Sequence, residues 1–289
     1  MTGIRTSHPS PSAREHPAPP ALAEGPGRGR MAADPFPRWL TDLEARHRSS
    51  LTFVEVRKAL QALSSLYVER RSRLSAGAAL ESAGKRAAFA LYYGPLHYLL
   101  LRRIVKALEA GQPAPTRILD LGCGTGVAGA AWALEAGGTP LLEGVDRNAW
   151  AVQEARWTLG ALGVRARIHQ GFADRARVPG AGGAIVAAFA LNEMEDADRE
   201  RLLERMMRAA RNRTRVLVVE PLARRAAPWW SEWAHTFRGI GGRENTWRFP
   251  VSLPEPLVLL DRAAGLDHRE LTGRSLWLAP SPAVETEGC

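Results

Sequence analysis

A run of glycines and three carboxylates stand where the sequence could hold a small ligand. The set consists of Asp120, Gly122, Gly124, Gly126, Asp146 and Asp174. Glycines let the backbone approach a ligand where any Cβ would intrude. A carboxylate accepts hydrogen bonds from an ammonium group or from ribose hydroxyls. These residue types therefore predict a site for a ligand that carries amino and hydroxyl groups.

Two classes of cofactor compete for the glycine run. Gly124, Gly126 and Gly129 satisfy the spacing G-x-G-x-x-G, which is typical of dinucleotide sites. Such a site places a pyrophosphate at the loop and at the start of the following helix. Asp120 stands two residues before the first glycine and would repel that dianion, so it favours a ligand with an ammonium group. Asp146 suits either class, because both classes contain ribose.

Alternating strands and helices must position these residues. Apolar runs predict strands at 117–121, 141–146, 166–170, 184–190 and 215–221, with helices at 127–136, 148–161 and 196–211. This order predicts an α/β fold with a mostly parallel sheet covered on both faces. Near the C-terminus two short strands are expected to meet in a hairpin turn at Gly273-Arg274, which adds an antiparallel pair at one edge. Ligands bind such sheets at the carboxyl ends of the strands.

The segment "ILDLGCGTG" resembles the first motif of class I S-adenosylmethionine-dependent methyltransferases. The resemblance spans about residues 116–280 and implies their Rossmann-like fold and their cofactor. In that family the first acid helps to hold the methionine ammonium group, the second accepts the ribose hydroxyls, and an acid after the third strand meets the adenine amino group. Carried over, the cofactor residues are Asp120, Gly122, Cys123, Gly124, Gly126, Asp146, Arg147, Phe172, Ala173, Asp174 and Ala190. The alternative is a nucleotide-binding or degenerate Rossmann-like domain without this ligand.

Catalytic groups are expected just after the fourth strand, in "FALNEME". Asn192 could orient an acceptor and Glu193 could act as a base. The alternative for Glu193 is a structural role, because the helix dipole stabilises a carboxylate at the start of a helix. The segment lacks the Asn/Asp-Pro-Pro-aromatic motif of enzymes that methylate exocyclic amines of bases. It also contains no cysteine, which argues against methylation of cytosine C5 through a thiolate.

A tryptophan-rich segment, "PWWSEWAHTFRGIGGRENTWRF", follows the fifth strand. Its tryptophans and arginines could stack on bases and meet phosphates of an acceptor. Alternatively Trp229 and Trp233, four residues apart, simply pack a helix onto the sheet.

The N-terminal third of the chain carries nearly all of the net charge of +9. Residues 1–110 hold 17 Lys and Arg against 9 Asp and Glu. We expect a disordered tail at 1–34, a basic helical region at 35–111, a cofactor-binding domain at 112–280 and a C-terminal tail at 281–289. A basic region beside a neutral domain favours a polyanionic partner such as RNA, with Arg70, Arg71 and Arg73 as contacts. The alternative is an arginine-rich solvated surface.

A narrower resemblance concerns "GKRAAFALYYGPLHYLLLRRIVKALEAG" together with "FALNEM" and "VLVVEP". These stretches are similar to methyltransferase-like proteins associated with the mitochondrial small ribosomal subunit and to their bacterial relatives. That resemblance implies a role with ribosomal RNA. The chain departs from it in having no cysteine at 221–288, where many members carry a metal cluster, so no metal is expected.

The sequence leaves three functions open. They are a methyltransferase acting on RNA or a ribosomal component, a small-molecule methyltransferase with a helical lid, and a non-catalytic assembly factor that binds RNA. The chain has no apolar run of about 20 residues, so no membrane span is expected. Its two cysteines exclude a disulfide scaffold and favour a cytoplasmic protein.

Overall fold

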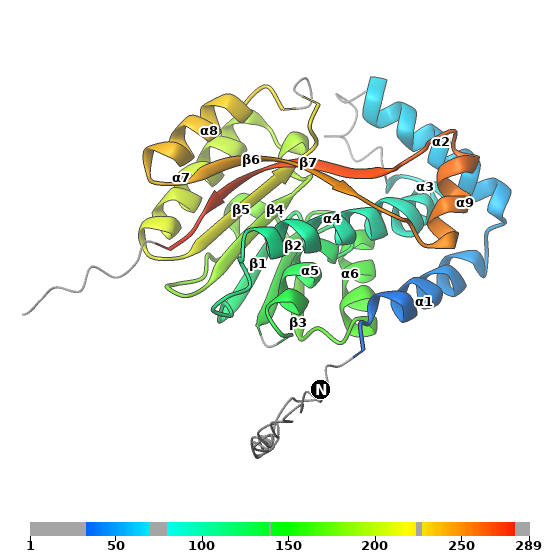
Figure 1. Ribbon diagram of the computed structural model, residues 1–289, viewed down its shortest axis with the longest axis horizontal. Coiled ribbons are helices and arrows are strands. Elements are labelled where there is room, and N and C mark those ends of the chain that lie inside the picture. Colours follow the sequence, from blue (N-terminus) through cyan, green and yellow to red (C-terminus); the bar gives the residue numbers. More distant parts are fainter. Residues whose placement is uncertain (1–32, 70–79, 139, 224–226, 281–289) are drawn as a thin grey trace, which may run out of the picture. The chain divides into compact units, whose positions relative to one another are not determined.

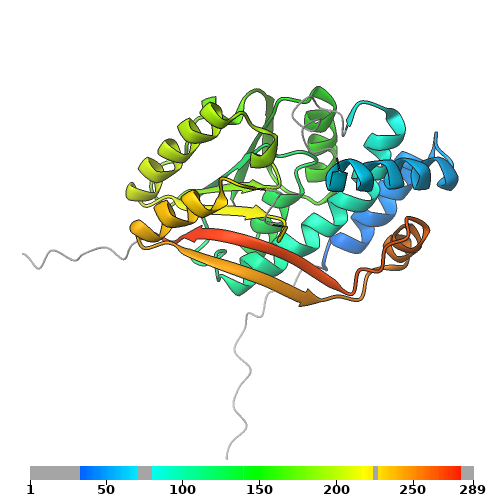
Figure 2. The same cartoon turned by 90° about the horizontal axis from the view of Figure 1, so that it is seen from above.

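A single seven-stranded sheet organises the chain, with the strand order β3-β2-β1-β4-β5-β7-β6 (Figure 1). The computed structural model describes residues 33–69, 80–138, 140–223 and 227–280. Strands β1 to β5 are parallel, and β7 is antiparallel to both of its neighbours, β5 and β6. The predicted Rossmann-like sheet with an antiparallel pair at one edge is confirmed. Figure 2 shows that pair, β6 and β7, in orange and red.

The elements follow the predicted ranges closely from β1 to β5. The strands are β1 (Arg117–Leu121), β2 (Leu141–Asp146), β3 (Ala166–Gln170), β4 (Ala184–Ala188), β5 (Arg215–Glu220), β6 (Arg243–Pro250) and β7 (Glu270–Leu278). The α-helices are α1 (Phe36–Arg48), α2 (Phe53–Glu69), α3 (Ala83–Ala88), α4 (Gly94–Ala107), α5 (Val127–Glu135), α6 (Ala149–Ala161), α7 (Asp196–Arg211), α8 (Trp230–Gly239) and α9 (Glu255–Ala263). Short helical turns are η3 (Phe89–Tyr93), η4 (Ala173–Arg175) and η5 (Leu191–Glu193).

Two hydrophobic cores cover the two faces of the sheet. One joins β1, β4 and β5 to α7 and α8, through Met206, Trp233 and Phe237 among others. The other joins the sheet to α5, α6 and the N-terminal helices, through Leu60, Leu101 and Trp132 among others. Strands β4 and β5 are covered on both sides, which explains why they are continuous apolar runs.

The N-terminal helices pack on the layer formed by α5 and α6. The apolar side chains Val56, Leu60 and Leu63 of α2 are buried. Helix α1 is tied to α6 by the buried carboxylate of Glu154, which meets His47 at 2.7 Å and Arg46 at 3.2 Å. These helices are therefore part of the main core.

Pro95 stands in the first turn of α4, the part of a helix where proline is best tolerated. Helix α3 continues through the π-helical turn η3 into α4, so Pro95 lies inside a continuous helical segment. In the π turn the N–H of Gly94 donates to the carbonyl of Phe89, five residues back. The wider turn accommodates a proline that would otherwise clash with the preceding turn.

The predicted hairpin turn at Gly273-Arg274 is wrong. Both residues lie within β7, where Gly273 pairs with Trp247 and Arg274 pairs with Thr246 and Glu220. The partner strand β6 comes from the tryptophan-rich segment, and α9 connects the two strands. Gly273 stands there because its Cα passes close to Leu100 of α4, where a Cβ would lie 3.1 Å from the leucine side chain.

Several expectations lie outside the described residues. They concern residues 1–32 of the N-terminal tail, the C-terminal tail at 281–289, and the arginines Arg70, Arg71 and Arg73. Within the described part, no helix is long and apolar enough to cross a membrane.

Candidate functional site

The carboxyl ends of β1, β2 and β4 bring the predicted ligand residues to one edge of the sheet. Strand β1 lies between β2 and β4, and all three are parallel. The glycine run, residues 122–126, leaves the end of β1 and leads into α5. This arrangement places the glycine loop at the centre of the site.

The backbone of the loop explains why glycines stand there. Gly122, Gly124 and Gly126 have φ of +66°, +51° and +81°, a region that other residues rarely adopt. A Cβ on Gly122 would lie 2.5 Å from the Cβ of Ala190, which follows β4. A Cβ on Gly124 would meet nothing within 4 Å, so space for a ligand lies beside that residue.

Asp120 is a buried acid, with 1% of its surface exposed. Its Oδ2 accepts a hydrogen bond from the N–H of Gly129 at 2.8 Å, whereas Oδ1 has no partner in the described chain. Burial raises the pKa of Asp120 to about 7 against the opposing effect of the Gly129 hydrogen bond. A cationic ligand group beside Oδ1 would restore the charged form.

Asp146 braces the glycine loop from the end of β2. Its Oδ2 accepts from the N–H of Gly124 at 2.9 Å, and its Oδ1 accepts from the N–H of Asn148 at 2.8 Å. Burial raises the pKa of Asp146, while these two hydrogen bonds lower it. Each carboxylate oxygen keeps a second lone pair for a ligand hydroxyl.

The residues after β3 form the far end of the site. Phe172 is 56% exposed, and the guanidinium of Arg175 lies 5.2 Å from its ring centroid. Ala173 packs among the side chains of the α7 core. Asp174 is buried, and its Oδ2 accepts a hydrogen bond from Arg201 of α7 at 3.2 Å.

The segment after β4 gives its two candidate catalytic residues different surroundings. Asn192 donates to Glu220 at 2.6 Å and accepts from the indole of Trp229 at 3.1 Å, so both ends of its amide are engaged. Glu193 lies 3.6 Å from Arg147, which follows β2, and 32% of its side chain is exposed. Burial raises the pKa of Glu193 to about 7, with Arg147 lowering it. This ion pair joins the segments on either side of β1.

The cysteine of the glycine loop and the paired tryptophans at the start of α8 are both buried in the packing of the fold. Cys123 is buried, and its side chain packs where a Cβ on Gly144 would come within 3.0 Å of the sulfur. Burial raises the pKa of this thiol well above its usual range. Trp229 and Trp233 are buried against each other, with ring centroids 4.9 Å apart, and pack α8 onto the sheet.

Sequence reasoning missed an aromatic cluster beside the end of β4. We define it by Phe89, Tyr93, His97 and Phe189, which come from η3, α4 and the residue after β4. The imidazole of His97 stacks on the ring of Phe189, with centroids 3.9 Å apart and planes at 17°. The signal was present in "FALYYGPLH", where Phe89, Tyr93 and His97 recur every four residues, but nothing in the local sequence pairs them with Phe189.

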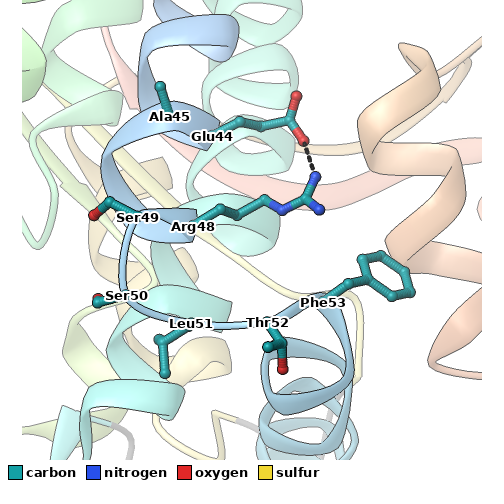
Figure 3. Close-up of a pocket in the computed structure, with 8 residues that line it drawn as sticks. All are labelled: Glu44, Ala45, Arg48, Ser49, Ser50, Leu51, Thr52 and Phe53. Atoms are coloured by element: carbon teal, nitrogen blue, oxygen red, sulfur yellow. Dashed lines mark ion pairs between the residues drawn. The ribbon is translucent and has the colours of Figure 1, made fainter.

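Two cavities in the described chain lie away from the residues at the carboxyl edge of the sheet. One, of about 630 Å³, lies where α1 ends and α2 begins, and Figure 3 shows its lining with the ion pair between Arg48 and Glu44. The other, of about 280 Å³, is mostly apolar and lies between these helices and α9. Neither is lined by the residues at the carboxyl edge. No group of metal-ligating side chains occurs in the described part of the chain.

Comparison with known proteins decides between the two cofactor classes. Residues 118–213, which include the glycine loop, Asp120, Asp146 and Glu193, match a family model described as a methyltransferase domain. This part of the chain is a methyltransferase domain. Its cofactor is S-adenosylmethionine, and the chain is an enzyme of the transferase class.

Solved methyltransferases resemble the chain at low sequence identity. The mitomycin 7-O-methyltransferase is 16% identical with a TM-score of 0.49, and the match covers 86% of this chain and 74% of that one. A TehB-like methyltransferase from Corynebacterium glutamicum is 16% identical with a TM-score of 0.41, over 62% and 87% of the two chains. The plantazolicin methyltransferase, solved with S-adenosylhomocysteine, is 12% identical with a TM-score of 0.45, over 79% and 98%. No curated protein matches the chain.

The methyltransferase domain fits its cofactor at three points. The buried Oδ1 of Asp120 lacks a partner within the described chain and would hold the methionine ammonium group. The buried hydroxyl of Thr125, in the glycine loop, also has no partner there and suits the methionine carboxylate. Asp146 would accept the ribose hydroxyls. When bound, the cofactor supplies an electrophilic methyl group to a nucleophile held in line with it.

Proposed function

We propose that this methyltransferase acts on a small, uncharged organic acceptor that lies against the aromatic cluster. The observation that carries the proposal is the stack of His97 on Phe189 at the end of β4. Small-molecule sites are lined mainly by apolar and aromatic side chains with a few polar groups, which describes this cluster.

The direction of the cofactor supports this placement. With the ribose on Asp146 of β2 and the ammonium group on Asp120 of β1, the methionine part points toward β4. The first turn of α4 approaches the glycine loop from that side, since a Cβ on Gly94 would lie 3.4 Å from the hydroxyl of Thr125. The transferable methyl group would therefore face the aromatic cluster.

On this proposal the segments before and after about residue 111 bind different ligands, the acceptor and the cofactor. The helices at 35–111 supply most of the aromatic cluster and act as a lid, and residues 112–280 hold the cofactor. Half of the described basic side chains of those helices are engaged with acids: Arg38, Arg46, Arg48, Lys85 and Arg102 each form an ion pair.

A ribosomal or other RNA acceptor is the second candidate, and a specific surface favours it. Four arginines on β3 or close to its two ends are exposed and form no ion pair within the described chain: Arg165, Arg167, Arg175 and Arg177. One of them, Arg175, lies over the exposed ring of Phe172, and an arginine beside an exposed aromatic ring suits an RNA-binding surface. We rank it second because β3 is three places from β4 in the sheet, roughly 14 Å away at the usual strand spacing.

Transfer of a labelled methyl group tests the proposal. The purified protein is incubated with methyl-labelled S-adenosylmethionine and a cytoplasmic extract, which is then separated into RNA, protein and small-molecule fractions. We expect the label in small molecules. The control is Asp146→Ala, which removes the ribose acceptor and should abolish transfer to every fraction.

Other outcomes distinguish the alternatives. Label confined to RNA would establish the second candidate and refute the first. Binding of S-adenosylhomocysteine without transfer to any fraction would instead indicate the non-catalytic assembly factor.

A further inference from the structure

His97 is the one polar side chain of the aromatic cluster that could take part in proton transfer at the methyl group. Its ring stacks on Phe189 and contacts Phe89 edge-on, with centroids 6.4 Å apart at 81°. Tyr93 lies 6.1 Å away, and its hydroxyl is directed to Ser64 of α2 at 3.2 Å. Neither imidazole nitrogen forms a hydrogen bond within the described chain, so both remain for a ligand.

The position of His97 brings it to the reacting end of the cofactor site. It lies one turn beyond Gly94, which approaches Thr125 of the glycine loop. Its stacking partner Phe189 precedes Ala190, which packs against Gly122. The imidazole is thus held between η3 and the segment after β4, and residues close to it on both sides contact the glycine loop.

The surroundings of His97 keep it neutral. Burial lowers its pKa to about 3, and no charged group contributes to that shift. The neighbours from η3, from α2 and from the end of β4 are Phe89, Tyr93, Ser64 and Phe189; of these only Tyr93 titrates, and burial raises its pKa. A neutral imidazole keeps one lone pair at every pH at which the protein would work.

We propose that His97 accepts the proton of a hydroxyl acceptor as the oxygen of that acceptor takes the methyl group. This inference rests on the function proposed above. The oxygen lone pair forms the new O–CH₃ bond, and the C–S bond breaks with its electron pair passing to sulfur. The hydroxyl proton passes to the free imidazole nitrogen, so the products are a methyl ether, a neutral thioether and protonated His97.

The chemistry favours oxygen over nitrogen as the nucleophile. A hydroxyl oxygen that has gained a methyl group is a far stronger acid than an imidazolium with a pKa of about 3, so its proton passes readily to His97. An alkylammonium group, with a pKa of about 10, would keep its proton beside such a base. His97 therefore selects an alcohol or a phenol and gives no help to an amine.

Binding measurements test the inference without requiring turnover. Calorimetry of the full chain saturated with S-adenosylhomocysteine uses three hydroxyl probes, phenol, catechol and benzyl alcohol, each beside its amine counterpart. We expect at least one hydroxyl probe to bind more tightly than its amine. His97→Gln should weaken that binding at least 10-fold and leave the affinity for S-adenosylhomocysteine within 2-fold. The matched control is His235→Gln, on the exposed side of α8, which should change neither.

Turnover gives a second readout. With labelled S-adenosylmethionine and the hydroxyl probe that binds best, His97→Gln should lower kcat 10²-fold or more, the usual range for loss of a general base. His97→Phe, which preserves the stack on Phe189 without the lone pair, should lose as much. Equal binding of hydroxyl and amine probes, or a rate within 3-fold of the parent in both variants, would overturn the inference. Failure of the parent to bind S-adenosylhomocysteine would refute the proposed function itself.

Discussion

Alanine at Gly122 and at Gly124 should damage the protein in two different ways. Both residues have positive φ, so alanine costs about 1–2 kcal/mol of unfolding free energy at either position. At Gly122 the new Cβ would also lie 2.5 Å from the Cβ of Ala190, and such overpacking adds about 1–3 kcal/mol. We therefore expect Gly122→Ala to lose about 2–5 kcal/mol and Gly124→Ala about 1–2 kcal/mol.

Affinity for the cofactor should rank these variants differently. The space beside Gly124 is open in the described chain, and we expect the cofactor to fill it. Gly124→Ala should then bind S-adenosylhomocysteine at least 10-fold more weakly despite its modest loss of stability. Gly163→Ala is the matched control, because Gly163 has φ of +71° and open space but lies after α6, away from the site.

The measurements are urea denaturation without ligand and calorimetry with S-adenosylhomocysteine. Gly163→Ala should lose about 1–2 kcal/mol of stability and keep the parental affinity. If Gly124→Ala also keeps the parental affinity, our placement of the cofactor beside the glycine loop is wrong. If Gly122→Ala is no less stable than Gly163→Ala, the close approach to Ala190 does not lower the unfolding free energy, and our expectation of overpacking is wrong.

Three further predictions concern charge. The pKa of Asp120 is raised from 3.8 to about 7, so the contribution of Asp120 to the unfolding free energy is full below pH 3.8 and falls as the pH rises to about 7. Asp120→Asn should remove that fall, stabilise the ligand-free protein by up to about 4 kcal/mol at pH 8 and weaken cofactor binding. If the unfolding free energy changes equally between pH 5 and pH 8 in the variant and in the parent, this reasoning is wrong. Glu154→Leu should cost about 1–3 kcal/mol, because it leaves Arg46 and His47 of α1 without their hydrogen-bond partner. Arg38→Ala, at a side chain that is 86% exposed, should cost under about 0.5 kcal/mol in the same denaturation assay. Replacing Arg167 and Arg177 with Gln should leave methylation of a small acceptor unchanged; if the second candidate is right, it should instead flatten the salt dependence of RNA binding in a filter assay by about one unit per lost phosphate contact.

The sequence predicts that Asp120, the glycine run and Asp146 lie together, and the structure places them so, because their position depends on local pattern. Asp120 and Asp146 end buried strands, and parallel strands bring their carboxyl ends to one edge whatever the details of packing. The glycines between them needed no tertiary information either, since their role follows from the turn that joins a strand to a helix. The mostly parallel sheet with helices on both faces followed from the same alternation.

The acceptor half could not be predicted because it depends on contacts between distant segments. His97 and Phe189 are separated by most of the domain, and nothing in their local sequence pairs them. Likewise β7 finds its partner in β6 only after α9 has returned the chain, so Gly273 was mistaken for a turn when it marks a close approach to α4. The engagement of Asn192 by Glu220 and Trp229 is equally a product of tertiary packing.

The π-helical turn η3 sets the rotation of everything that follows it in the helix. One extra residue in a turn rotates the downstream helix by about 100° relative to an uninterrupted α-helix. Leu96 and Tyr98, the neighbours of His97, are both buried in the core. Removing a single residue from Phe89–Tyr93 would therefore turn one of these core side chains toward β4 and carry the imidazole away from Phe189. The number of residues in η3 therefore determines whether His97 faces Phe189. A one-residue deletion in η3 and the substitution of His97 should abolish the same activity, but only the deletion should also disturb the core.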